Sequence, residues 1–241
     1  MFRRILNKFK STFLPHIKKT LYYEEIWESR PIDDVKKYIP SQERPSRYWL
    51  AKKIVASVNK YQIESPKILE VGCDLGANLY SLKKILPDSC ELVGIDISPA
   101  SIQAAQNYMS ELGAPDIKFY EAKADDLGIF KDDYFDVVFT DAVLLYVADD
   151  KIQSALSELS RVSKKMIFLL ELSSENNSSK GIHTLDGWIR NYEILIKNNY
   201  DRCDIHIDKV DSKVRSAGRW PTQGELIKVI SSNNFVPNKV D

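Results

Sequence analysis

Apolar residues in this chain alternate between short continuous runs and longer stretches with helical spacing. Residues 46–61 carry apolar side chains on one helical face, and the run 68–71, which follows a proline, predicts a short buried strand. A glycine-bearing segment at 72–76 comes next, followed by a predicted helix that ends near Pro87 and a second strand at 91–95. The order strand, loop, helix, strand predicts one βαβ unit.

The same alternation continues through the middle of the chain. Ser98 and Pro99 form the N-cap and first turn of another predicted helix, which ends at Gly113. Further apolar runs predict three strands at 117–120, 135–140 and 166–170, and a helix at 151–162. Five strands that alternate with helices predict an α/β fold with a doubly wound, Rossmann-like parallel sheet in three layers. Two later runs, 205–207 and 226–230, are candidate edge strands whose order the pattern does not give.

Composition narrows the class of protein. The 241 residues suffice for one large α/β domain or two small ones. Lys plus Arg equal Asp plus Glu at 34 each, so no overall field favours nucleic acid as a partner. The three cysteines lack metal-ligand or CxxC spacing, which is typical of reduced thiols in a cytoplasmic protein, and we expect no metal. No run of about 18 apolar residues is present, so the sequence predicts no membrane span.

The N-terminal end differs from the rest of the chain. Residues 1–20 contain six basic side chains and no acidic one, and apolar residues within 2–14 recur at helical spacing. This pattern predicts a basic amphipathic helix. The helix either binds a membrane surface or a protein partner or packs on its own domain, and an organelle presequence is a further alternative. We therefore expect an N-terminal arm and cover at 1–45, a ligand-binding domain at 46–241, and a cytoplasmic protein, either free or peripheral to a membrane.

The loops after the predicted strands hold the residues with unusual chemistry. In an open α/β sheet, ligands bind beyond the carboxyl ends of the strands, where the winding direction reverses. Gly72 and Gly76 there permit a tight turn and a close approach of the backbone to a ligand. Asp96 ends the second strand, where a carboxylate can accept hydrogen bonds from both ribose hydroxyls. Together these residues predict a nucleoside-binding site.

The charges of the glycine turn favour one kind of nucleoside. A dinucleotide fingerprint requires G-x-G-x-x-G, but aligning Gly72 with its first glycine places Asp74 at the second, where a carboxylate would face a pyrophosphate. Glu70 and Asp74 instead suit a cofactor with a sulfonium and an ammonium group. S-adenosylmethionine fits this pattern better than NAD. An NAD-dependent oxidoreductase and a binding module without turnover are the alternatives.

At this point the residues resemble a known family. The segments ILEVGC at 68–73, GANL at 76–79 and VGIDIS at 93–98 are similar to the first two motifs of class I S-adenosylmethionine-dependent methyltransferases. Shorter segments at 124–127, 135–138 and 159–165 resemble later parts of the family pattern, so the likeness covers about 46–171. It implies a sheet of about seven strands, mostly parallel, with an antiparallel strand at the edge.

The resemblance also implies a set of cofactor-binding residues. They are Glu70, Gly72, Cys73, Asp74, Gly76, Asn78, Asp96, Ile97, Ala124 and Asp125. Glu70 and the two glycines would hold the methionine part, Asp96 the ribose, Ile97 the adenine face, and Asp125 or the backbone of Ala124 the adenine edge. Family members usually carry glycine where Asp74 stands and often an acid where Lys123 stands, so the chain departs from the pattern at both positions.

The methyl acceptor is inferred mostly by elimination. Residues 140–143 lack the Asn/Asp-Pro-Pro-aromatic motif found in amino-methylating DNA and some protein methyltransferases, and the net charge is neutral. We therefore expect a small molecule, such as a sugar, a lipid-linked intermediate or another secondary metabolite. A metal-dependent enzyme would need further acids converging with Asp141, and Glu171 is the nearest candidate, so we prefer a metal-free reaction.

Three residues are candidates for catalytic roles. Asp141 follows the fourth strand and is the best-placed base for a hydroxyl acceptor, and Tyr146 on the same loop is expected to orient the substrate. His183 is the third candidate, because it lies beyond the fifth strand in a cluster predicted to line the acceptor pocket with Trp188, Arg190 and Tyr192. The structural alternatives are a turn cap, a packed ring and a structural histidine.

An aromatic segment precedes the core. Tyr22, Tyr23 and Trp27 alternate with glutamates there. They form either a cover that folds over the cofactor or the packed face of an amphipathic helix.

Overall fold

A seven-stranded sheet forms the centre of the protein in the computed structural model. The structure describes residues 17–31, 33, 45–175, 180–184, 187–200 and 202–231. Side chains are described from Tyr23 onward. The predicted basic helix at 2–14 therefore lies outside the described residues, and Tyr22 is described only as part of a helix backbone. The strands are β1 (Lys67–Val71), β2 (Glu91–Asp96), β3 (Lys118–Glu121), β4 (Phe135–Asp141), β5 (Ser163–Leu172), β8 (Cys203–Lys209) and β9 (Gly224–Ser231).

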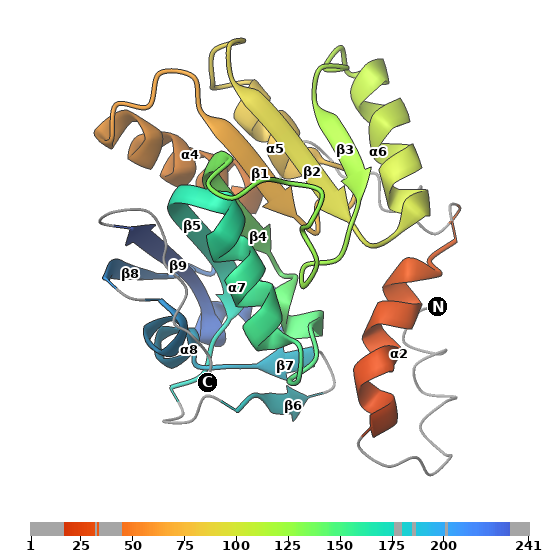
Figure 1. The fold of residues 1–241 in the computed structure, drawn as a ribbon, viewed down its shortest axis with the longest axis vertical. Coiled ribbons are helices and arrows are strands. Elements are labelled where there is room, and N and C mark those ends of the chain that lie inside the picture. The colour runs from red at the N-terminus through yellow and green to blue at the C-terminus, as the bar shows by residue number, and fades with distance from the viewer. Residues whose placement is uncertain are drawn as a thin grey trace.

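The strand order is β3-β2-β1-β4-β5-β9-β8, which confirms the predicted doubly wound fold (Figure 1). Strands β1 to β5 pair in parallel, whereas β9 is antiparallel to both β5 and β8. The antiparallel strand therefore lies one place inside the edge, because β8 covers its outer side. The winding direction reverses between β1 and β4, and the carboxyl ends of β1, β2 and β4 meet there.

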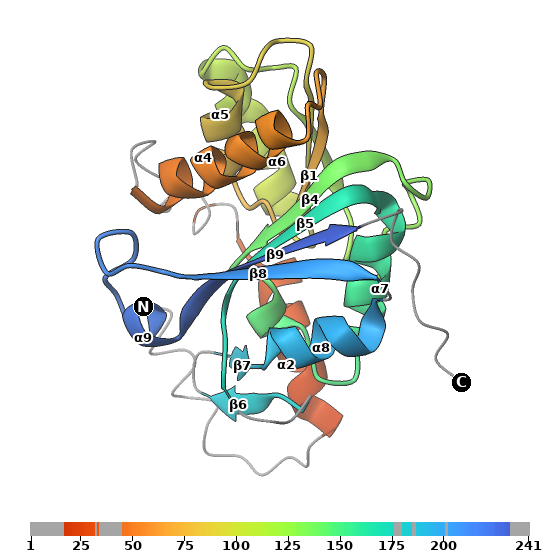
Figure 2. The ribbon, with the colours of Figure 1, turned by 90° about the vertical axis from the view of Figure 1, so that its left-hand side faces the viewer.

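Helices cover both faces of the sheet (Figures 1 and 2). Helices α4 (Pro45–Lys60), α5 (Ala77–Lys83) and α6 (Pro99–Glu111) bury their apolar residues on one face, and α7 (Ile152–Val162) and α8 (Tyr192–Asn199) on the other. The predicted N-cap of α6 forms, since Ser98 Oγ accepts a hydrogen bond from Ser101 N at 3.2 Å. No helix within the described ranges is both long and apolar enough to cross a membrane.

Smaller elements surround the carboxyl ends of the strands. These are α2 (Ile17–Glu28), the 3-10 helix η2 (Leu144–Tyr146), the hairpin of β6 (Ile182–Thr184) and β7 (Gly187–Ile189), and α9 (Trp220–Gln223). Sequence periodicity did not indicate α8, α9, η2 or the β6–β7 hairpin, because each is too short to show a clear repeat.

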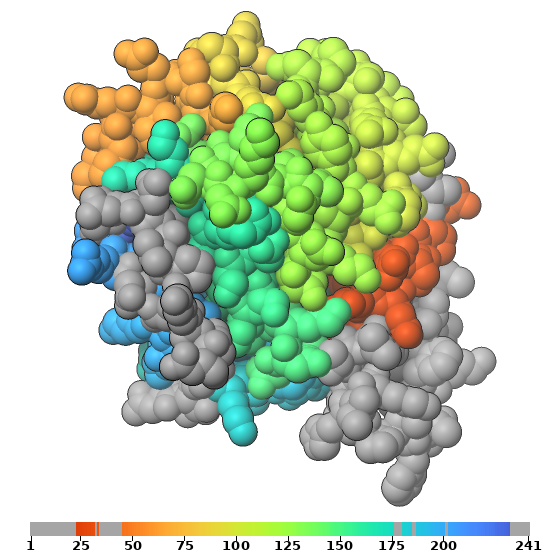
Figure 3. Space-filling model, in the orientation of Figure 1, coloured from red at the N-terminus to blue at the C-terminus, as the bar shows by residue number. Residues whose placement is uncertain are grey.

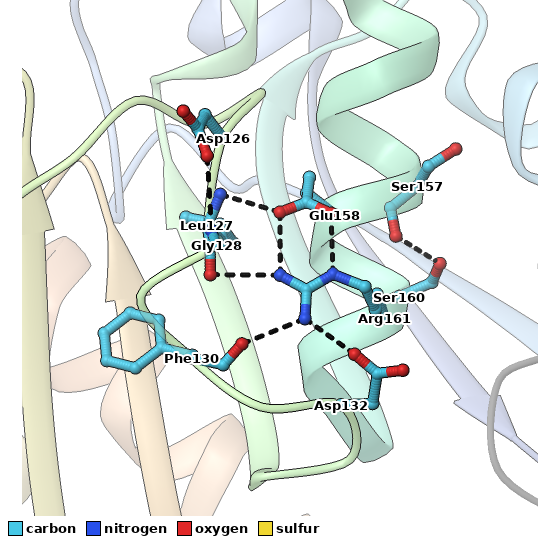
Figure 4. A network of polar contacts seen from close by, with 9 residues as sticks. All are labelled: Asp126, Leu127, Gly128, Phe130, Asp132, Ser157, Glu158, Ser160 and Arg161. Atoms are coloured by element: carbon cyan, nitrogen blue, oxygen red, sulfur yellow. Dashed lines mark hydrogen bonds and ion pairs between the residues drawn. The ribbon is translucent and has the colours of Figure 1, made fainter.

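One arginine ties the loop between β3 and β4 to α7 (Figure 4). Arg161 pairs with both carboxylate oxygens of Glu158, at 2.7 and 2.8 Å. Its guanidinium also donates to the carbonyl oxygens of Leu127 and Phe130, at 3.0 and 2.9 Å, and to Asp132 Oδ1 at 2.7 Å. These bonds fix a loop that also carries residues 122–125 beside the sheet edge.

Replacing this arginine tests how much that network stabilises the fold. We expect Arg161→Met to lower the free energy of unfolding by about 2 kcal/mol, because two partly buried carbonyl groups and Glu158 lose their donor. Arg161→Lys should recover little of the loss, since an ammonium group cannot reproduce the planar fork. Urea denaturation measures both, with exposed Lys164→Met as the control. A loss below about 0.5 kcal/mol would contradict the assignment.

Candidate functional site

Two adjoining cavities open at the carboxyl ends of β1, β2 and β4. The first has a volume of about 320 Å³ and the second about 520 Å³. Both are bordered by Gly72, Asp74, Asp141 and Ala142, so they form one continuous site. The site lies at the reversal of the sheet winding, where ligands bind in open α/β folds.

The predicted adenosine-binding residues line the first cavity. They are Asp96, Ile97, Ala124 and Asp125, and the aromatic residues Tyr23, Trp27 and Tyr146 line the same cavity. Asp96 Oδ2 accepts a hydrogen bond from Asp74 N and its Oδ1 from Ser98 N, both at 2.9 Å. Burial raises the pKa of Asp96 to about 6. Each oxygen has a further lone pair with which to accept a ligand hydroxyl.

The glycine turn brings backbone close to this cavity. Gly72 N and Cys73 N both donate to Ile95 O at 2.8 Å, which joins the turn to β2. Gly72 has φ 74°, and a Cβ at this position would lie 2.9 Å from Val143 Cγ1 and closer still to its Cγ2. Gly72 is therefore required by both conformation and packing.

Two of the predicted cofactor residues also have structural roles. Gly76, also at positive φ, lines neither cavity; it is the N-cap of α5, and a Cβ there would lie 2.6 Å from the ring of Phe119. Cys73 borders the second cavity but is only 4% exposed, and it belongs to the apolar core. Burial accordingly raises the pKa of its thiol.

The second cavity contains a buried carboxylate and amide with unsatisfied acceptor atoms. Glu70 is 1% exposed, and its Oε1 accepts a hydrogen bond from Asn78 Nδ2 at 2.7 Å. Among the described residues, neither Glu70 Oε2 nor Asn78 Oδ1 has a donor. Burial raises the pKa of Glu70 well above its ordinary value. Buried acceptors of this kind normally have partners, so the pair indicates a ligand that supplies donors, such as an ammonium group.

Asp141 lies at the boundary between the cavities, at the end of β4. Its Oδ1 pairs with Arg215 Nη2, and its Oδ2 accepts a hydrogen bond from Asn78 Nδ2 at 3.1 Å. Arg215 comes from the connection between β8 and β9, and it also lies over the ring of Trp220. Both residues line the second cavity, and neither was predicted from the sequence.

The other two catalytic candidates occupy different environments. Tyr146 lines the first cavity, with its ring centroid 5.1 Å from that of Trp27 and 5.5 Å from that of Tyr23. His183 is exposed on β6 and lines neither cavity; its ring packs 5.9 Å from Tyr23 and 4.8 Å from Trp188. Tyr146 is thus in reach of a ligand in the first cavity, whereas His183 contacts Tyr23, which lines that cavity, but does not line it itself.

The prediction that Arg190 and Tyr192 line an acceptor pocket is wrong, because both side chains are fully buried. Arg190 donates to Leu144 O at 2.8 Å and to Val147 O at 2.7 Å, which holds η2 in place. A sequence of mixed polar and aromatic residues after β5 gives no sign of this burial.

Glu171 likewise supports the loop after β4. It is fully buried, and its Oε1 accepts hydrogen bonds from Thr140 Oγ1, Val143 N and Leu144 N at 2.9 to 3.0 Å. Burial raises its pKa to about 7. No group of three or more metal-ligating side chains occurs within the part of the chain that the structure describes.

Asp74, which we expect to favour a cationic cofactor, lines both cavities, but its carboxylate also has partners within the protein. Asp74 Oδ1 accepts a hydrogen bond from Arg30 Nη1 at 2.8 Å and one from Ser101 Oγ at 3.3 Å. Asp74 also has φ 46°, which explains why glycine suits this position. The acid that faces the second cavity without a cationic partner at hydrogen-bond distance is Glu70.

Residues 23–31, here termed the cover, contact both positions at which the chain departs from the family pattern. Arg30 pairs with Asp74, while Lys123 Nζ lies 3.9 Å from Glu24 and 3.8 Å from Glu28. Lys151 adds a closer pair with Glu24 at 2.7 Å. Figure 3 shows the cover in orange-red against the green surface of the central part of the chain. The cover thus walls the first cavity through Tyr23, Glu24, Trp27 and Arg30.

Comparisons with known proteins agree with this geometry. Residues 68–166 match the family described as a methyltransferase domain. An uncharacterized protein of Rickettsia prowazekii is 28% identical over 139 residues, covering 54% of this chain and 22% of that protein. One from Haemophilus influenzae is 28% identical over 108 residues, covering 44% and 42%. The matches therefore span less than half the length of these curated relatives.

Solved structures share the fold at low sequence identity. Magnesium protoporphyrin IX methyltransferase from Synechocystis, with bound S-adenosylmethionine, has a TM-score of 0.62 at 15% identity, covering 92% of this chain and all of that one. An S-adenosylmethionine-dependent methyltransferase from Aquifex aeolicus has a TM-score of 0.59 at 13% identity, covering 83% and 98%. The [4+2]-cyclase SpnF scores 0.62 at 14% identity, covering 88% and 95%, so this fold also serves another reaction.

Proposed function

We propose that this chain, which has the fold and the domain signature of a class I S-adenosylmethionine-dependent methyltransferase, transfers a methyl group to a small-molecule acceptor. The strand order confirms the predicted fold, and the match of residues 68–166 to a methyltransferase domain supports the predicted family. The observation that carries the proposal is the pair of unsatisfied acceptors, Glu70 Oε2 and Asn78 Oδ1, beside a glycine turn and a carboxylate at the end of β2.

The two cavities fit the two ends of the cofactor. S-adenosylmethionine is the cofactor, and when bound it supplies an electrophilic methyl group on a sulfonium. Asp96 accepts hydrogen bonds from the ribose hydroxyls, and Ile97, Ala124 and Asp125 enclose the adenine in the first cavity. In the second cavity, Glu70 and Asn78 accept hydrogen bonds from the ammonium group. Arg47, which also lines this cavity, holds the carboxylate.

The residues around the boundary of the cavities position the acceptor. Methyl transfer is an in-line displacement, and its barrier falls when donor and acceptor are held in near-attack geometry. Tyr146 and Trp27 provide aromatic walls that exclude water beside the reacting groups. Asp141 accepts the proton if the acceptor is a hydroxyl. The aromatic wall and the neutral net charge both support a small molecule.

Calorimetric titration with S-adenosylhomocysteine tests the cofactor assignment. We expect wild type to bind and Asp96→Ala to bind about 10- to 30-fold more weakly, because the ribose hydroxyls lose their acceptor. Asp88→Ala, whose side chain is almost fully exposed, is the control and should bind like wild type. Absence of binding to wild type, or binding of NAD in its place, would refute the proposal. Methyl transfer from labelled S-adenosylmethionine to a metabolite pool then tests turnover.

The cover should contribute modestly to cofactor affinity. We expect Asp74→Gly to weaken S-adenosylhomocysteine binding about threefold to fivefold, because a partly exposed ion pair contributes up to about 1 kcal/mol. Its free energy of unfolding should stay constant or rise slightly, since glycine adopts the positive φ without strain.

Arg30→Ala should have the same effect on binding, and the double variant should be no weaker than either single one. Additive losses in this cycle would show that Asp74 and Arg30 act separately.

A further inference from the structure

The connection between β8 and β9 contributes a wall of the second cavity to which the proposed function assigns no cofactor contact. This wall consists of residues 214–217 and Trp220. The guanidinium of Arg215 lies 4.0 Å from the centroid of the Trp220 ring and pairs with Asp141. The Arg215 side chain is only 16% exposed. The Trp220 ring and the Asp141 carboxylate together hold the planar guanidinium of Arg215 in a fixed orientation at the end of β4, beside the proposed site of methyl transfer.

Positive charges outnumber negative ones in the second cavity once the proposed cofactor is bound. Asp74 is already paired with Arg30, and Asp141 with Arg215. The cofactor's ammonium group offsets Glu70, and its carboxylate offsets Arg47. The sulfonium then adds one further positive charge to the groups of the second cavity, while Asp96 lies in the first. A partly buried site of low dielectric favours an anion at this position.

We propose that the methyl acceptor carries a carboxylate or phosphate group and that Arg215 binds this group in exchange for Asp141. This inference rests on the proposed function. A guanidinium recognises both anions through two parallel hydrogen bonds, so one residue serves either chemistry. Arg215 is thus a specificity-determining residue contributed by the β8–β9 connection.

The exchange also prepares Asp141 to act as a base. In the structure, both oxygens of Asp141 are engaged, one by Arg215 and the other by Asn78. An acceptor anion that takes Arg215 frees Oδ1. The acceptor oxygen or nitrogen then bonds to the methyl carbon as the carbon–sulfur bond breaks, its electron pair stays on sulfur, and the acceptor's proton passes to Asp141. A neutral acceptor leaves Asp141 blocked, so the ion pair discriminates between the two classes.

Anion binding to the loaded protein tests the proposal before the acceptor is known. Protein saturated with S-adenosylmethionine, which retains the sulfonium charge, is titrated with inorganic phosphate, with acetate, and with acetamide as the neutral counterpart of acetate. We expect at least one anion to bind wild type and acetamide not to bind. Arg215→Gln should weaken the anion at least about tenfold, whereas Arg219→Gln, exposed on the same connection, should not. The tighter anion identifies which group the acceptor carries.

The outcomes separate this inference from the proposed function. S-adenosylhomocysteine should bind Arg215→Gln within about threefold of wild type, which also shows that the variant is folded. Should Arg215→Gln not fold, Trp220→Leu takes its place, with an expected loss of anion affinity of at least about threefold. Failure of wild type to bind S-adenosylhomocysteine would refute the proposed function. Cofactor binding without anion binding, or equal anion binding by wild type and Arg215→Gln, would refute only the role of Arg215.

Discussion

Gly72→Ala should lower the free energy of unfolding by about 3 kcal/mol and abolish measurable binding of S-adenosylhomocysteine. Two causes combine in this loss. The residue has φ 74°, which a Cβ disfavours by about 1 to 2 kcal/mol. The added Cβ would also lie 2.9 Å from Val143 Cγ1, so the loop after β4 must move. That loop carries Tyr146 and follows Asp141, so the displacement reaches both cavities.

A matched glycine separates the two causes. Gly113 has φ 72°, and a Cβ there would meet no atom within 4 Å. Gly113→Ala should therefore cost only the conformational part, about 1 kcal/mol, and leave cofactor affinity unchanged. The double variant Gly72→Ala with Val143→Ala should recover part of the stability. If chemical denaturation gave equal losses of unfolding free energy for Gly72→Ala and Gly113→Ala, the close packing against Val143 would be unimportant.

Glu70→Gln should weaken S-adenosylhomocysteine binding by about 100-fold, roughly 2.7 kcal/mol, without destabilising the protein. The amide cannot offset the ammonium charge, and its NH₂ group would confront another donor. The protein without ligand should be as stable as wild type or more so, because a buried carboxylate with an unsatisfied oxygen is costly to retain.

These opposite effects distinguish a ligand-binding role from a structural one. Thermal unfolding without ligand and calorimetric titration measure the two quantities on the same preparations. Exposed Glu111→Gln serves as the control for loss of a carboxylate. A Glu70→Gln protein that is strongly destabilised and binds the cofactor normally would show that Glu70 only supports β1.

The sequence predicted the features whose signals are local. Short apolar runs predicted five strands and marked two later segments as candidates, and all seven form. The glycine turn together with Asp96 predicted the end of the sheet at which the cavities lie. Each signal arises within a few neighbouring residues, where the side-chain period or the demand for positive φ is visible.

Contacts between distant parts of the chain were not predictable in this way. Arg30 meets Asp74 across 44 residues, and Arg215 meets Asp141 across 74. A single sequence does not show which cation approaches which acid, and it therefore gives no sign that Asp74 is paired with Arg30. Arg190 was misplaced for a related reason, because a charged residue is seldom fully buried unless backbone carbonyl groups pair with it.

The ion pair between Arg30 and Asp74 has a consequence for how this protein can evolve. An aspartate at position 74 adopts a backbone conformation that suits glycine, and the benefit that offsets this strain is its contact with Arg30. A lineage that lost the arginine would retain the strain without the benefit, and selection would then favour a return to glycine. We therefore expect positions 30 and 74 to change together among relatives of this chain.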